Sequence, residues 1–183
     1  TEADQSLSPS WRFDSILDFI HRQAPDVVLL QEVYENDLER YGNALGGRVD
    51  FSRMCRLSMT DREEDAESWG VAIGSRFRFI DIGERREQYY HGIREDADTI
   101  VLNNGLQATS SLLQASFEVG SARFNVGTTH FTWHNQAEPS KEQLEDFKKL
   151  AVLLDRNPDL VLTGDFNSPR GYPIFDSIAQ RYR

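Results

Sequence analysis

Three polar side chains stand where two apolar stretches of the sequence end. Asp165 and Asn167 follow the short apolar run 160–162, and Glu32 follows the run 27–30. In open α/β folds, ligand-binding groups gather at the carboxyl ends of the strands. Carboxylate and amide oxygens at such a position can bind a hard cation or orient a water molecule. We therefore treat these three residues as candidate site residues.

The two stretches have the same order of residue types. Pro25 and Pro158 are each followed by an aspartate, an apolar run and then an acid, Glu32 or Asp165, seven residues after the proline. Each run also follows a segment with the periodicity of an amphipathic helix. We therefore expect two helix–strand–acid units whose acids meet in space. The alternative is that Glu32 is an ordinary polar residue at the end of a strand.

His130 is the fourth candidate. It alternates with Thr128 and Val126 along a predicted strand over 122–132, and so shares one face with them. A single histidine at the end of a mostly apolar face is more often a hydrogen-bonded structural residue than a catalytic one, and both interpretations stay open here. His134 lies in the polar loop that follows and is a weaker candidate.

Helical periodicity and end signals predict the elements that hold these residues. Ser8 and Pro9 are typical of a helix start, and Ser140 with Gln143 forms a capping box. The predicted helices cover about 9–24, 35–44 and 141–157, with a short fourth helix beginning near Tyr172.

The remaining segments read as strands and loops. Residues 69–76 and 77–82 predict two strands that form a hairpin or lie at a sheet edge, and 106–119 pairs antiparallel with 122–132. We expect an irregular, solvated loop over 48–68. We expect a second loop over 84–105, where Tyr89, Tyr90 and His91 are surface residues or, alternatively, contact a substrate.

Bulk composition favours one domain and says little about partners. The 183 residues are enough to bury about 70% of the unfolded surface around one core. A formal net charge of −10 gives no overall basic surface, so strong nonspecific attraction to nucleic acid or anionic membranes is not expected. An acidic enzyme can still act on phosphate esters when bound cations and a local patch offset its field.

Cysteine content and hydropathy narrow the class of protein further. Cys55 is the only cysteine, which excludes an intramolecular disulfide and a cysteine-based zinc site. No apolar run approaches the ~18 residues of a membrane-spanning helix. We expect a monomer in the cytoplasm without a transmembrane segment. Because the chain does not begin with methionine, we expect that it is processed or trimmed.

Four motifs, in order and approximate spacing, resemble those of the endonuclease/exonuclease/phosphatase superfamily. This superfamily includes deoxyribonuclease-like nucleases, deadenylases, neutral sphingomyelinases and inositol polyphosphate 5-phosphatases. The resemblance covers about 10–180, and the GDFN motif after a strand is its most specific part. The motifs are DVVLLQEV at 26–33, WGVAIGSR at 69–76, TTHF at 128–131 and GDFNSP at 164–169.

The resemblance implies a four-layer α/β sandwich in which two mixed β-sheets pack face to face, helices lie outside, and the active site lies at one end. The two helix–strand–acid units suit this pseudo-twofold arrangement. The resemblance also implies hydrolysis of a phosphoester bond with a divalent metal ion, Mg²⁺ or alternatively Mn²⁺.

The same resemblance implies a role for each candidate residue. Glu32 is expected to bind the metal ion, and Asp165 to orient or deprotonate the attacking water. Asn167 and His130 are expected to hydrogen-bond the phosphate. These roles suit the chemistry, because phosphate oxygens repel nucleophiles, so a hard cation and a water-orienting carboxylate are both needed.

Two parts of the family pattern are missing from this sequence. The family has an N-terminal strand that supplies an asparagine beside the metal, and a C-terminal Asp-His pair on later strands. This chain begins with the polar lead to its first helix and ends at Arg183, soon after the motif at 164–169. We therefore expect one domain over 1–183 that lacks the N-terminal strand and the C-terminal strands, and a natural protein that extends at both ends.

Three functions remain possible from the sequence. The favoured one is a Mg²⁺-dependent phosphoesterase, either a nuclease-type phosphodiesterase or a phosphatase, whose partner is a phosphate-ester substrate such as nucleic acid, a phosphorylated lipid or a small molecule. The rival is a noncatalytic binding module on the same fold. An unrelated α/β protein with chance motifs would place Glu32 and Asp165 far apart. We expect substrate contacts at 134–136 and near Tyr90.

Overall fold

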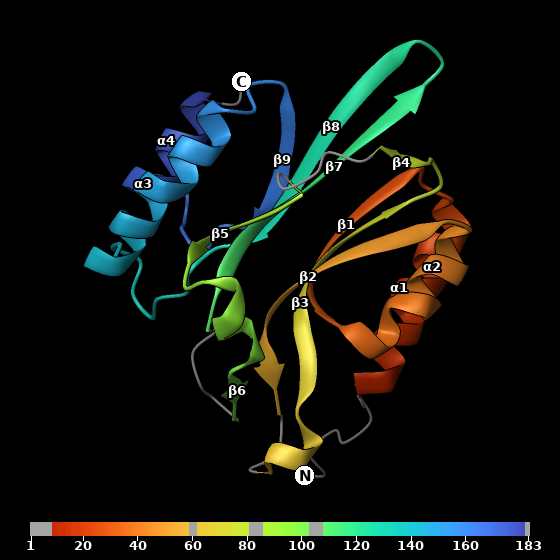
Figure 1. Cartoon of the computed structure of the whole chain (residues 1–183), viewed down its shortest axis with the longest axis horizontal. Coiled ribbons are helices and arrows are strands. Elements are labelled where there is room, and N and C mark those ends of the chain that lie inside the picture. The colour runs from red at the N-terminus through yellow and green to blue at the C-terminus, as the bar shows by residue number, and fades with distance from the viewer. Residues whose placement is uncertain (1–8, 59–61, 81–85, 103–107, 182–183) are drawn as a thin grey trace, which may run out of the picture.

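Two β-sheets pack face to face between two pairs of helices in the computed structural model, which describes residues 9–58, 62–80, 86–102 and 108–181 (Figure 1). Sheet A has the order β1-β3-β2-β6, and sheet B has the order β4-β7-β8-β9, with β5 also pairing with β7. Each sheet contains antiparallel pairs and one parallel pair, β2 with β6 in sheet A and β8 with β9 in sheet B. Both sheets are therefore mixed, as predicted.

The bounds of the elements are as follows. Sheet A consists of β1 (Val27–Tyr34), β2 (Arg48–Leu57), β3 (Glu67–Ser75) and β6 (Ile100–Val101). Sheet B consists of β4 (Phe79–Ile80), β5 (Glu87–His91), β7 (Ser110–Val119), β8 (Ala122–His130) and β9 (Leu160–Asp165). The α-helices are α1 (Pro9–Gln23), α2 (Leu38–Leu45), α3 (Lys141–Asp155) and α4 (Pro173–Arg181), and the 3₁₀ turns are η1 (Glu35–Asp37), η2 (Glu63–Asp65) and η4 (Arg94–Asp98).

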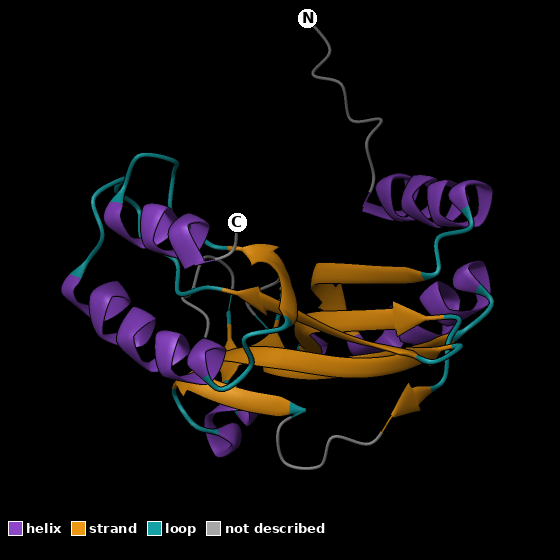
Figure 2. Ribbon diagram, turned by 90° about the horizontal axis from the view of Figure 1, so that it is seen from above, coloured by secondary structure: helices purple, strands orange, loops and turns teal. Residues whose placement is uncertain are grey.

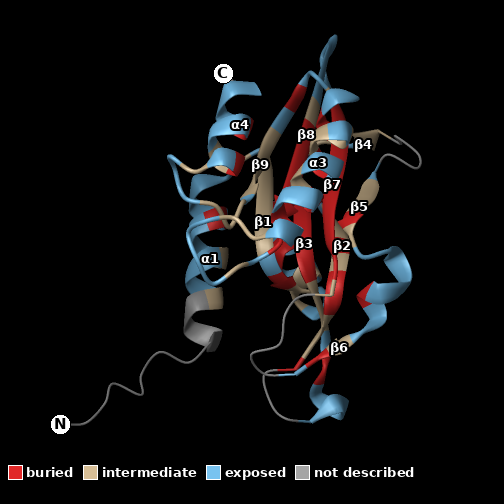
Figure 3. Cartoon of the chain, turned by 90° about the vertical axis from the view of Figure 1, so that its left-hand side faces the viewer, coloured by how far each residue is buried: buried red, intermediate tan, exposed pale blue. Residues whose placement is uncertain are grey.

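Alternation along the central strands builds three apolar layers. Val71 and Ile73 of β3 point toward sheet B, whereas Ala72 between them joins the cluster that packs under α1 and α2. Leu113 of β7 likewise faces sheet A, and Leu112 packs under α3 and α4. The helices thus lie on the two outer faces (Figure 2), and the buried positions concentrate on the central strands (Figure 3). This arrangement confirms the predicted four-layer sandwich.

The two helix–strand–acid units are present, but their strands are less buried than the sequence predicted. The strands β1 and β9 lie at the edges of their sheets. Positions 27–30 are only half-buried, and Val161 is 58% exposed. The sequence could not show this, because a run of aliphatic residues reads the same in a central strand and an edge strand.

Two predictions about the middle of the chain are wrong, and a third is confirmed only in part. Residues 48–57 form strand β2 instead of a loop. The strands β3 and β4 belong to different sheets, so they form no hairpin, although β4 does lie at a sheet edge. The segment predicted as one loop over 84–105 contains β5, η4 and β6.

The predicted helices and the antiparallel pair β7–β8 are confirmed. The capping box is also present, since Ser140 Oγ accepts from the Gln143 N–H and Gln143 Oε1 accepts from the Ser140 N–H. The predicted cap Ser8 lies outside the described residues. No described helix has the length and apolarity needed to cross a membrane.

Candidate active site

Parallel pairing of β8 with β9 places His130 beside Asp165 at the carboxyl ends of both strands. The two strands approach closely here because Gly164 has no side chain. A Cβ at Gly164 would lie 2.2 Å from the carbonyl oxygen of Thr129. The glycine of the GDFN motif is thus required for the distance between the strands that carry the two candidate residues.

The turn after β9 fixes the carboxylate of Asp165. Its Oδ1 accepts the backbone N–H of Asn167 at 2.9 Å, and its Oδ2 lies 3.9 Å from Nε2 of His130. The Asp165 side chain remains 52% exposed and can therefore meet water. Asn167 has a left-handed backbone (φ +45°), which asparagine adopts more readily than most residues, and its Nδ2 donates to the carbonyl of Phe131 at 2.6 Å.

Glu32 stands on a β-bulge in β1. The register with β3 shifts between Leu30 and Val33, so two residues of β1 oppose one of β3. Glu32 has a φ of +57°, a conformation that costs roughly 1–2 kcal/mol for a residue with a Cβ. The bulge leaves the Glu32 side chain exposed, while the preceding Gln31 donates from Nε2 to Thr128 Oγ1 of sheet B at 2.7 Å.

The structure places His130 beside Asp165, and Glu32 is near enough for its charge to act on the same ring. His130 is only 5% exposed, and its burial lowers the pKa of the imidazole, while the nearby charges of Asp165 and then Glu32 oppose that shift. Burial thus favours the neutral form of the imidazole. Carboxylates from the two helix–strand–acid units thus both act on the buried ring of His130.

The surroundings of His130 bear on the two interpretations of this residue. Its ring meets the indole of Trp69 edge-on, with 5.4 Å between the centroids. Within the described residues its buried Nδ1 has no hydrogen-bond partner, and its Nε2 points to the Asp165 carboxylate. A hydrogen-bonded structural histidine would have its ring nitrogens satisfied, so this environment does not match the structural interpretation.

The donor groups of the site are compatible with Mg²⁺, an ion that is seldom enclosed by protein ligands alone. The described residues contain no group of three His, Cys, Asp or Glu side chains that could hold a metal ion. Mg²⁺ keeps several of its waters and is usually bound by one or two carboxylates together with substrate phosphates. Exposed carboxylates such as those of Glu32 and Asp165 are compatible with that mode of binding.

The other positions at which we expected substrate contacts have mixed outcomes. Tyr90 is 2% exposed and its hydroxyl bonds to Thr129 Oγ1, so the prediction of a surface or substrate-facing role is wrong for this residue. His91 bonds through Nδ1 to the buried carboxylate of Asp146 at 2.9 Å. His134 is half-buried and accepts a long hydrogen bond from the Gln136 N–H, and its contact with a substrate stays a prediction.

Sequence reasoning missed three residues that shape the site. Trp69 and Gln31 were included only as parts of the motifs at 69–76 and 26–33, without a role of their own. Gln143 was identified as a helix cap, but its amide also reaches the carbonyls of Thr132 and Asn167. Only the burial of a polar side chain could have signalled this second role, and burial is not visible in a sequence.

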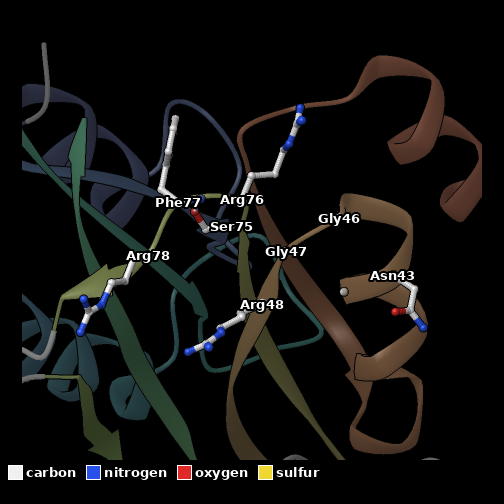
Figure 4. A pocket seen from close by; sticks show the side chains of 9 residues that line it. Asn43, Gly46, Gly47, Arg48, Ser75, Arg76, Phe77 and Arg78 are labelled. Carbon is white, nitrogen blue, oxygen red and sulfur yellow. Dashed lines mark hydrogen bonds between the residues drawn. The ribbon is translucent and has the colours of Figure 1, made fainter. Parts of the chain in front are cut away.

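A concavity of about 650 Å³ lies away from these residues, at the other end of sheet A. There Ser75 pairs with Val27, five residues before Glu32, which corresponds to roughly 17 Å along a strand. Among the described residues, no carboxylate lines this concavity, and Arg76 donates to the carbonyl of Ala24 after α1. Figure 4 shows Arg48 and Arg78 extending to one side and Arg76 to the other. This concavity therefore lacks the carboxylates of the candidate active site.

Comparison with known proteins shows the family to which the chain belongs. Residues 7–183 match the model of the Endonuclease/Exonuclease/phosphatase family. No curated protein sequence matches the chain.

Solved structures share the fold at low sequence identity. A functionally unknown conserved protein from Enterococcus faecalis has a TM-score of 0.69 and 18% identity, over 98% of this chain and 68% of that one. The human Nocturnin catalytic domain has a TM-score of 0.64 and 18% identity, over 93% and 61%. A mannosyl-6-phosphatase from Bacteroides thetaiotaomicron has a TM-score of 0.63 and 17% identity, over 94% and 62%. The chain thus spans about two thirds of the lengths of these structures.

Proposed function

Because the chain belongs to the endonuclease/exonuclease/phosphatase family, whose members are phosphoesterase hydrolases, we propose that this protein hydrolyses a phosphoester bond with a bound divalent metal ion. The observation that supports the proposal is the position of the exposed Asp165 carboxylate beside the buried ring of His130, on which the charge of Glu32 also acts. A phosphate group repels anionic nucleophiles, so its hydrolysis needs charge neutralisation next to a group that activates water.

Asp165 is the proposed group that orients the attacking water and accepts its proton. The Asn167 N–H holds one carboxylate oxygen, which fixes the plane of the group, and the side chain is open to solvent. A general base in this position contributes typically ~10²- to 10⁴-fold to the rate. The turn that contains Asp165 therefore supplies both the base and its orientation.

His130 and Asn167 are the proposed hydrogen-bond donors to the phosphate. A neutral imidazole protonated on Nε2 can donate toward the place where the phosphate oxygens gather charge. Asn167 already donates one amide hydrogen to Phe131, which holds the side chain in place and leaves the second hydrogen for the substrate. Fixed donors are effective because they need no reorganisation when charge develops.

Glu32 is the proposed ligand of the metal ion, Mg²⁺ or alternatively Mn²⁺. When bound, the ion neutralises phosphate charge and stabilises the leaving oxygen. The proposed substrates are nucleic acid, a phosphorylated lipid or a phosphorylated small molecule. A phosphate monoester is one candidate, since a mannosyl-6-phosphatase is among the similar structures.

An assay with generic phosphodiester and phosphomonoester substrates tests the proposal. Hydrolysis should require a divalent ion, stop with EDTA and return when Mg²⁺ is added. Asp165→Asn should lower kcat at least ~100-fold because it removes the general base. Asp159→Asn, which removes one exposed carboxylate just before β9, is the matched control and should keep full activity. Activity that survives EDTA, or full turnover by Asp165→Asn, would refute the mechanism. Phosphate binding without turnover would favour the noncatalytic module.

A further inference from the structure

A buried amide from α3 joins the two segments that carry the candidate site residues. Gln143 is only 2% exposed, although it is polar and lies in the first turn of a surface helix. Its Nε2 donates to the carbonyl of Thr132 at 2.7 Å and reaches the carbonyl of Asn167 at 3.4 Å. Thr132 lies two residues after His130, and Asn167 lies two residues after Asp165.

Capping α3 does not explain this arrangement. In a capping box, only the side-chain oxygen of the third helical residue is needed, and here Oε1 of Gln143 accepts the Ser140 N–H at 3.1 Å. The amide nitrogen has no part in that cap and could have remained in water. Burying it is unfavourable unless its hydrogens are bonded, and its two acceptors come from two different loops.

A second residue of α3 holds the same segment. Asp146, one turn after Gln143 and also 2% exposed, accepts the Thr132 hydroxyl at 2.8 Å. The same carboxylate meets Nδ1 of His91 at 2.9 Å and lies 3.3 Å from Nζ of Lys149, so its buried charge is compensated. The segment after β8 is therefore fixed through both its backbone and its side chain. Of these two residues of α3, Gln143 also reaches the segment after β9.

We infer that Gln143 is a positioning residue that sets the relative placement of Asn167, Asp165 and His130, an inference that rests on the function proposed above. Asn167 sits in a left-handed conformation and spans the same gap through its bond to Phe131. Without the Gln143 amide, that conformation loses the bond to the Asn167 carbonyl. Because a misplacement of about 1 Å can cost ~10²-fold in rate, loss of this amide acts on catalysis without touching the substrate.

The variant Gln143→Glu separates positioning from capping. Glutamate keeps an oxygen for the Ser140 N–H but places a second oxygen against two carbonyls, so the connection between the loops is lost. Gln143→Met removes both polar atoms without burying a charge and serves if the glutamate variant folds poorly. Ser140→Ala is the matched control, because it removes the hydroxyl that accepts the Gln143 N–H and leaves the amide in place.

Two readouts decide the matter, both taken well below the melting temperature of every variant. For Gln143→Glu and Gln143→Met we expect kcat to fall at least ~10-fold with a change in KM of less than ~3-fold, whereas Ser140→Ala keeps kcat within ~2-fold. We also expect the NMR signals of the Asn167 side-chain amide to shift in both Gln143 variants and to stay in place in Ser140→Ala.

The result that overturns the inference is an unchanged Asn167 signal in the Gln143 variants, or equal losses of kcat in these variants and in Ser140→Ala. If the full-length protein hydrolyses no phosphoester, the proposed function fails. The NMR comparison still decides whether Gln143 positions Asn167.

Discussion

Replacing Gly164 by alanine tests how tightly the geometry of the site depends on the packing of two strands. Gly164 has a φ of +153°, and a Cβ there would lie 2.2 Å from the carbonyl oxygen of Thr129. Such contacts essentially never fall below 3.0 Å, so alanine must push β9 away from β8 by about 0.8 Å at this point. The obstacle is backbone, so no side chain can rotate out of the way.

This displacement occurs next to the candidate site residues. Thr129 precedes His130 and Gly164 precedes Asp165, so the 3.9 Å between Nε2 and Oδ2 should lengthen. Overpacking of this kind destabilises a protein by about 1–3 kcal/mol. A shift of nearly 1 Å between reacting groups lowers the rate by about 10- to 100-fold. We therefore expect Gly164→Ala to lose both stability and kcat.

Urea denaturation and steady-state hydrolysis measure the two effects. Gly171→Ala is the matched control, since Gly171 also has a positive φ (+85°) but has no neighbouring atom within 4 Å of the added Cβ. It should show only the cost of the strained backbone, about 1 kcal/mol, and unchanged kcat. Wild-type stability and turnover in Gly164→Ala would refute the dependence of the site on this close approach.

Two further predictions concern the strained and buried residues of the site. Glu32→Gly should raise the free energy of unfolding by about 1 kcal/mol, because glycine accepts the left-handed conformation, and should abolish metal-dependent turnover; a destabilised variant in urea denaturation would contradict the assigned strain. His130 has a lowered pKa in the fold because it is buried, so the unfolded chain binds the proton more readily. Its contribution to stability is complete above the unfolded pKa of about 6.5 and is lost as the pH falls through the lower folded pKa. His130→Gln should therefore flatten the loss of stability between about pH 7 and pH 5 in thermal melts, and an unchanged pH profile would rule out this linkage.

The strand ends and the helix starts could be predicted from the sequence because their signals are local. A proline, an apolar run and an acid mark β1 with Glu32 and β9 with Asp165, and a capping box marks the start of α3. Each of these signals depends on residues within one turn or one strand. The expectation that the two acids meet came from the repetition of the same unit, together with the family resemblance.

Strand β2 could not be predicted because its inward face is polar. Asp50 forms an ion pair with Arg86, and the hydroxyl of Ser52 bonds to Ser111 and to Glu87 across the sheet interface. Partners that lie far away in the sequence satisfy these groups. Polar and apolar residues alternate over 48–52, but this alternation does not continue past the register shift between Arg53 and Cys55, so the local pattern is too short to mark the whole strand.

The finer geometry of the site also depends on distant parts of the chain. The bulge at Glu32 arises from the pairing of β1 with β3, and the edge-on contact between Trp69 and His130 arises from the packing of the two sheets. The buried amide of Gln143 depends on two loops that follow different strands. None of these features has a periodicity or a motif of its own, so sequence reasoning named the residues without their arrangement.

The most direct test of the proposed site is an NMR titration with Mn²⁺, whose paramagnetism broadens the signals of nearby nuclei. Binding at the carboxylate pair predicts selective broadening of Glu32, His130 and Asp165, reversal by excess Mg²⁺, and much weaker binding by Glu32→Gln. Glu39→Gln, which removes an exposed carboxylate on α2, should bind Mn²⁺ as the wild type does. Broadening centred elsewhere, or unaffected by Glu32→Gln, would contradict a metal-dependent site at this end of the sandwich.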